Sequence, residues 1–94
     1  MDAARIVTIV WEGIEIEVTY KPKDILAMSH LELRIPSRAR IPVTETGYRS
    51  EFLHPGTVED GGGPQAYVIA WLDHMAQSRE WQDHVVTSRQ LSLF

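Results

Sequence analysis

The chain has 94 residues, a net charge of −4 and no cysteine, so we expect one small domain without disulfides, thiolate chemistry or a cysteine-based zinc site. The apolar fraction is 44% and the charged fraction 23%, which is ordinary for a folded chain and argues against global disorder. Every apolar run falls short of the roughly 20 residues of a membrane span, and the N-terminus lacks the layout of a signal peptide. We therefore expect a cytoplasmic protein that makes no membrane contact.

The negative charge is concentrated in the second half of the chain. Residues 1–50 contain seven Lys or Arg and seven Asp or Glu, whereas residues 51–94 contain two Arg and six Asp or Glu, a balance of −4. An acidic half is a poor surface for a phosphate backbone, so we do not expect direct nucleic-acid binding as the main role. The residues that could form a local basic patch are Arg34, Arg38, Arg40 and Arg49.

Three strands are predicted in the first third of the chain. Residues 5–11 are rich in β-branched side chains, and Gly13 then supplies the positive φ that a tight hairpin needs. Residues 14–20 and 30–35 alternate apolar and polar side chains, which indicates strands with one buried face. Prolines follow both segments and leave residues 37–40 as loop or edge strand. We therefore expect a three-stranded antiparallel meander.

Turns and then helices are predicted in the remainder of the domain. Gly and Pro punctuate residues 42–64, with a short helical turn near 57–60 that Thr57 could cap. Pro64 suits the first position of a helix, and Ser78 suits the cap of a second helix that carries Trp81 and Val85. The apolar residues that recur at helical spacing after Pro64 are Tyr67, Val68, Trp71, Leu72 and Met75.

These elements together predict an α+β fold, in which a three-stranded antiparallel sheet is packed by two C-terminal helices and followed by a short C-terminal tail. The apolar face of the sheet needs a cover, and the helices are the segments that can supply it. We assign residues 1–89 to a single small domain and residues 90–94 to the tail.

The tail carries the most specific functional signal of the chain, the run Gln90-Leu91-Ser92-Leu93-Phe94. It resembles the pentapeptide Gln-Leu-Ser/Asp-Leu-Phe by which bacterial proteins dock on the DNA-polymerase sliding clamp, and all five positions fit. The resemblance implies that Leu93 and Phe94 fill an apolar pocket on the clamp and that Leu91 adds a contact. Gln90 would hydrogen-bond at the pocket rim, and Ser92 would face partly outward. The structural alternative is that the three apolar residues pack on the protein's own core, as one more strand.

A second resemblance covers roughly residues 42–94. The segments 44–50 and 62–73, together with the final pentapeptide, resemble a group of short uncharacterised alphaproteobacterial proteins that are often found on plasmids and other mobile elements. This resemblance implies a genetic setting and no activity.

Catalytic and metal-binding patterns are weak. The four histidines, at positions 30, 54, 74 and 84, lack the spacings that place two imidazoles one helical turn apart, so we expect no metal. Ser50 and His54 are four residues apart, but the nearby Gly and Pro disfavour the helix that would bring them together. We therefore expect no cofactor and no enzymatic activity.

The segment 44–50 admits two interpretations. As a loop it could present Tyr48 and Arg49 to a partner or to phosphate. The favoured interpretation is a structural corner, in which Arg49 pairs with Glu45 or Glu51 and Tyr48 packs inward.

The function that we expect is a non-enzymatic adaptor or regulator that binds the bacterial sliding clamp through residues 90–94. The alternative is a plasmid- or phage-associated DNA- or nucleoprotein-binding accessory that uses Arg38, Arg40, Tyr48 and Arg49, with a purely structural tail. Exposed sheet edges are also compatible with a homodimer.

Overall fold

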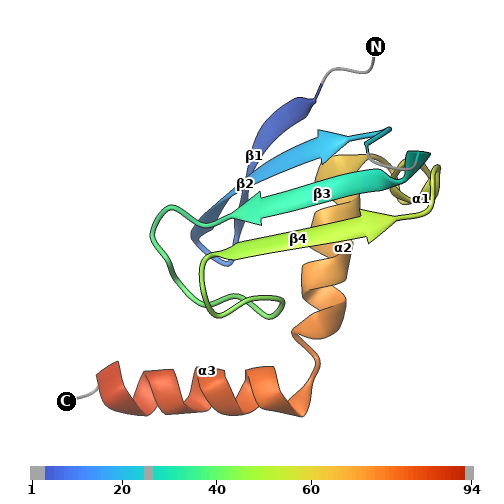
Figure 1. Ribbon diagram of the computed structural model, residues 1–94. Coiled ribbons are helices and arrows are strands. Elements are labelled where there is room, and N and C mark those ends of the chain that lie inside the picture. The colour runs from blue at the N-terminus through green and yellow to red at the C-terminus, as the bar shows by residue number, and fades with distance from the viewer. Residues whose placement is uncertain (1–3, 25–26, 93–94) are drawn as a thin grey trace.

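The computed structural model describes residues 4–24 and 27–92 and contains one antiparallel sheet with three helices (Figure 1). The strands lie in the sheet in chain order: β1 (Arg5–Trp11), β2 (Ile14–Lys21), β3 (Ser29–Arg34) and β4 (Tyr48–Leu53). The helices are α1 (Thr57–Asp60), α2 (Pro64–Met75) and α3 (Arg79–Ser92). The α+β class is thus confirmed.

The predicted number of strands is wrong, because the sheet has a fourth strand, β4, at its edge. None of its residues is fully buried, since exposed and half-buried positions alternate along it. Its half-buried positions include the charged residues Arg49 and Glu51, so β4 lacks the apolar alternation that marks a strand in sequence. The segment 44–50, expected to be a loop or corner, therefore ends inside this strand.

The first hairpin forms as the sequence predicts. Trp11 pairs with Ile14 across a two-residue turn, in which Glu12 and Gly13 have φ values of 47° and 79°. Positive φ at both turn residues is the conformation that matches the right-handed twist of the two strands. The turn thus fixes the register of β1 against β2.

The two faces of the sheet have different environments. On the inner face, apolar side chains from β1, β2 and β3 form the core with Val68 and Leu72 of α2, which crosses behind the sheet (Figure 1). The Trp11 indole donates to Asp73 Oδ1 at 2.8 Å and ties β1 to this helix. The opposite face, called the outer face below, carries exposed side chains such as Ile6, Val10 and Phe52.

The helix starts match the sequence with one exception. Pro64 occupies the first turn of α2. The backbone N–H of Trp81 donates to Ser78 Oγ at 3.2 Å, as expected of the cap of α3. The exception is α1, where Gly56 occupies the N-cap position and no side chain caps the helix. The predicted capping role of Thr57 is therefore wrong.

The long connection between β3 and β4 contributes to the core. Ile41 and Val43 are buried, and Ile41 forms an isolated bridge with Thr44. The expected loop at residues 37–40 is confirmed, and it contains the positive φ of Arg38, 61°. None of the described helices combines the length and the apolar character that crossing a membrane requires.

Candidate functional site

The helix that leads to the C-terminal pentapeptide is anchored by its first two turns. Trp81 is buried and packs on Trp11, with ring centroids 5.8 Å apart and ring planes tilted by 55°. Val85, one helical turn later, is half-buried against the same core. The Gln82 side chain donates to the Ala76 carbonyl at 2.7 Å and holds the link between α2 and α3. The start of α3 is therefore fixed on the body of the protein.

A polar cluster flanks this anchor. Arg40 Nη2 lies 3.1 Å from Glu45 Oε1 and 3.2 Å from Glu80 Oε1. One guanidinium therefore joins the β3–β4 loop to α3. The same guanidinium lies 3.5 Å from Nδ1 of His84, whose ring contacts Trp81 at a centroid distance of 4.9 Å. The two carboxylates are well exposed, so each pair contributes little to stability, about 0–1 kcal/mol. The cluster orients α3 more than it stabilises it.

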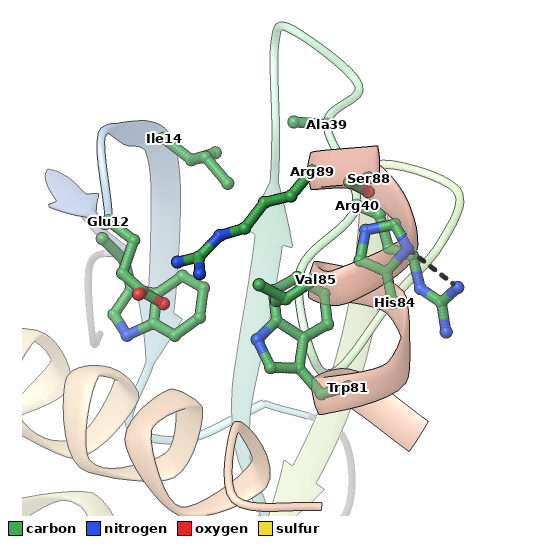
Figure 2. Close-up of a pocket in the computed structure, with 10 residues that line it drawn as sticks. Glu12, Ile14, Ala39, Arg40, Trp81, His84, Val85, Ser88 and Arg89 are labelled. Atoms are coloured by element: carbon green, nitrogen blue, oxygen red, sulfur yellow. Dashed lines mark hydrogen bonds between the residues drawn. The ribbon is translucent and has the colours of Figure 1, made fainter. Parts of the chain in front are cut away.

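An open groove of about 440 Å³ runs between α3 and the turn of the first hairpin. Ile14, Trp81 and Val85 supply apolar walls (Figure 2), together with Trp11. Glu12, Arg40 and Arg89 add charged side chains to the lining. The lining residues are Trp11, Glu12, Ile14, Ala39, Arg40, Trp81, His84, Val85, Ser88 and Arg89.

Beyond Val85 the described side chains of α3 are exposed. This holds for residues 86–89, and the apolar residue among them, Val86, is 54% exposed. The backbone remains helical as far as Ser92, while the side chains of Gln90, Leu91 and Ser92 and the whole of Leu93 and Phe94 lie outside the described residues. Figure 1 shows α3 below the sheet. The pentapeptide thus begins within the last turn of α3, directly after the exposed residues 86–89, so the expected boundary between domain and tail at residue 89 falls inside this helix.

The four residues of the predicted basic surface do not share one face. Arg38 and Tyr48 line the same hollow of about 560 Å³, together with Arg34. The Arg34 guanidinium lies 5.9 Å from the centre of the Tyr48 ring, a cation–π arrangement. Tyr48 is 45% exposed, so the expectation that it packs inward is wrong.

The other two arginines are held elsewhere. Arg40 belongs to the cluster beside α3. Arg49 lies on the inner side of β4, where it donates to Glu51 at 2.7 Å and to the Val43 carbonyl at 3.2 Å. Its guanidinium also lies 5.7 Å from the Trp71 ring centre. The predicted pairing of Arg49 with Glu51 is therefore confirmed, and Arg49 serves as a structural contact between β4, the loop and α2.

A cluster around His30 was not predicted from the sequence. The ring Nε2 lies 2.6 Å from Ser50 Oγ. The sequence had paired Ser50 only with His54, a pairing that it disfavoured. Nδ1 lies 2.8 Å from Asp24 and 3.6 Å from Glu32. Neither contact has the geometry of a hydrogen bond, and Nδ1 is buried without a hydrogen-bond partner among the described residues. Phe52 stacks on the ring at 4.3 Å, nearly parallel.

The His30 cluster has the order of groups found in acyl-transfer triads, with a hydroxyl, an imidazole and a carboxylate. Nucleophilic catalysis also needs a substrate pocket beside the hydroxyl, and neither hollow described above includes Ser50 or His30. The His30–Ser50 contact joins the paired strands β3 and β4. Within residues 4–24 and 27–92, no three His, Asp or Glu side chains are arranged to hold a metal ion.

The fold and these contacts define a small α+β domain with one covered sheet face and an anchored C-terminal helix. Residues 4–81 match the family model of the KlcB third domain, and the chain belongs to that family. No curated protein and no solved structure gives a significant match. The family match ends at Trp81, before the pentapeptide, so it covers the sheet, α1, α2 and only the start of α3.

Proposed function

We propose that the protein is a non-enzymatic adaptor that docks on the bacterial DNA-polymerase sliding clamp through residues Gln90–Phe94. The observation that carries this proposal is the full agreement of those five residues with the clamp-binding consensus. The position of the pentapeptide supports it, because the described side chains just before it, residues 86–89, are exposed. A docking peptide must leave the body of the protein to enter a pocket on another molecule.

The energetics suit a reversible tether. Leu93 and Phe94 would each gain roughly 1.5–3 kcal/mol on full burial in an apolar pocket, and Leu91 would add a smaller contact. Ordering a short segment at the end of a helix costs less than ordering a long disordered chain. We expect a dissociation constant near micromolar, about −8 kcal/mol. The globular body would then either exclude polymerases from the clamp or bring another factor to it.

The test is a fluorescence anisotropy titration of the full chain with a bacterial sliding clamp. The chain has no cysteine, so Lys23→Cys provides a single labelling site at an exposed position far from the tail in sequence. Truncation after Arg89 should abolish binding. Leu93→Ala and Phe94→Ala should each weaken binding by about tenfold or more.

Val86→Ala is the matched control, since it removes an exposed aliphatic side chain from the same helix outside the pentapeptide. It should leave the affinity unchanged. Circular dichroism establishes that every variant is folded. A folded wild-type chain that does not bind the clamp, or a truncated chain that binds as well as the full one, contradicts the proposal.

A second candidate is a DNA- or nucleoprotein-binding accessory, and one observation favours it. Arg34 and Arg38 share the hollow beside Tyr48, and neither forms an ion pair with a carboxylate among the described residues. This surface is narrower than the sequence suggested, because Arg40 and Arg49 are engaged elsewhere. Salt-dependent binding of an oligonucleotide that is lost in Arg38→Ala would favour this candidate.

A further inference from the structure

Strand β1 forms one edge of the sheet and carries a concentration of exposed apolar surface. Ile6 and Val10 are 65% and 67% exposed, the highest values among the large apolar side chains of the described chain. Both lie on the outer face, one on each side of Thr8. A long edge strand that presents apolar side chains is a strong candidate for pairing with another strand.

The hairpin register shows which backbone groups of β1 remain free of β2. Trp11 and Ile14 flank a two-residue turn and form a hydrogen-bonded pair. Hydrogen-bonded and non-hydrogen-bonded pairs alternate along an antiparallel ladder, so Ile6, Thr8 and Val10 point their N–H and C=O groups away from β2. No described turn, loop or cap hydrogen bond engages the backbone of β1.

The side chains of β1 are arranged symmetrically around Thr8, so that the strand can pair with an antiparallel copy of itself. In an antiparallel pair centred there, Thr8 faces Thr8 of the partner subunit, and Ile6 faces Val10 of the partner subunit on the outer face. On the inner face, Val7 faces Ile9 of the partner subunit. Thr–Thr and aliphatic cross-strand pairs are favourable, and a two-fold interface requires this reciprocity. The free backbone groups of Ile6, Thr8 and Val10 are the ones that this register would join.

Space for the partner exists on the inner side of the same edge. A hollow of about 740 Å³ lies between the start of β1 and the first half of α2, lined by Val7, Ala66 and Ile69 among others. Ile69 is itself 37% exposed. A second β1 strand would bring its own inner-face aliphatic side chains to this hollow.

The opposite edge of the sheet, strand β4, has features that discourage pairing with another strand. On β4, Arg49 and Glu51 place charges on the inner face, and inward-pointing charges are a device that discourages edge pairing. The hydroxyls of Thr44 and Thr46 also donate to the Tyr48 carbonyl, at 2.8 and 3.3 Å. Described strand β1 carries its inner-face charge, Arg5, at its first residue, outside the segment 6–10 that an antiparallel pair centred on Thr8 would join.

We propose that two copies of this chain pair through β1, antiparallel and centred on Thr8, so that their sheets join across a two-fold axis. The proposal is independent of the clamp-docking function, because its residues lie in β1 and the tail lies at the other end of the chain. We assign the partner strand to a second copy of this chain, because in this register the side chains of β1 match those of an antiparallel β1.

Cross-linking tests the register directly. In a hydrogen-bonded antiparallel pair the Cα atoms are about 5.5 Å apart, within the range of about 4.4–6.8 Å that a disulfide spans. The chain has no other cysteine, so Thr8→Cys should form a cross-linked dimer rapidly under mild oxidation. Thr19→Cys, which pairs with Ile6 from β2 on the same face, is the control and should cross-link far more slowly.

A charge-swap series measures the same interface in solution by sedimentation. The wild-type chain should have twice its monomer mass of 10.7 kDa at concentrations well below 1 mM. Ile6→Glu should weaken the dimer at least about tenfold, because the partner's Val10 then faces a charge. Combining it with Val10→Lys should restore dimerisation, since the new charges would face each other across the axis.

Any of three results would overturn the proposal. One is a wild-type chain that stays monomeric up to a concentration on the order of 1 mM, the limit of weak specific association. Another is a dimer that Ile6→Glu leaves unchanged, and the third is a dimer that cross-links equally well through Thr8→Cys and Thr19→Cys. A folded circular dichroism spectrum for every variant separates loss of pairing from loss of structure.

Discussion

At the scale of single residues, the contact between Tyr20 and Glu59 links the sheet to α1. The buried Tyr20 hydroxyl donates to Glu59 Oε2 at 2.5 Å. Burial and the neighbouring carboxylate raise the pKa of Tyr20. The hydrogen bond from Tyr20 in turn lowers the pKa of Glu59 below its ordinary value of 4.5, with a smaller contribution from Arg5. The pair is therefore held as a neutral phenol and an ionised carboxylate.

This pair predicts part of the pH dependence of stability. A lowered folded-state pKa stabilises the fold above the unfolded-state pKa, and that contribution disappears as the pH falls from about 4.5 through the folded-state value. We expect the wild-type chain to lose more stability than Glu59→Gln between neutral pH and about pH 3.5. Urea unfolding at both pH values measures the difference.

The matched control is Asp60→Asn, which removes an exposed carboxylate from the same helical turn. It should keep the acid sensitivity of the wild-type chain. Equal acid sensitivity in Glu59→Gln and the wild type would show that the Tyr20–Glu59 contact contributes nothing to the pH dependence.

At the scale of elements, the apolar anchor of α3 consists of very few residues. Trp81 contacts Trp11 and His84, and Val85 completes the apolar contact with the core. The later described side chains of the helix, residues 86–89, are exposed. A helix held in this way should detach without unfolding the sheet, because local stability follows local burial.

We therefore expect Trp81→Ala to release α3 and to cost about 3–5 kcal/mol of local stability, the usual range for a buried tryptophan. The helical circular dichroism signal should fall, while amide protons of β2 and β3 stay protected from exchange. Val86→Ala should change neither observable. Loss of protection throughout the sheet in Trp81→Ala would show instead that α3 and the sheet unfold as one unit.

At the scale of the whole molecule, the two proposed interactions use opposite ends of the chain. Pairing through β1 involves residues 5–11, whereas clamp docking involves residues 90–94. Ile6→Glu should therefore bind the clamp with unchanged affinity per chain, and the chain truncated after Arg89 should still dimerise. Sedimentation and anisotropy on the same two variants measure this independence. A variant that loses both interactions, while remaining folded, would show that the two surfaces are coupled.

Much of the fold could be predicted from particular residues. The positive φ at Gly13, the alternation of residues 14–20, and the Pro64 and Ser78 starts of α2 and α3 are local properties, and each appears in the structure. Edge strand β4 could not be predicted in this way, because its half-buried positions include charged side chains that find partners only in the folded chain.

The candidate sites also divide into features that the sequence shows and features that depend on the fold. The sequence alone led to the proposed docking role of Gln90–Phe94, because resemblance to a linear motif is recognised without the fold. Only the tertiary structure decided that Arg38 and Tyr48 line one hollow while Arg40 and Arg49 do not. It also brought His30 to Ser50 and placed β1 at the edge of the sheet. These features depend on strand pairing between residues far apart in the chain, which local propensity does not encode.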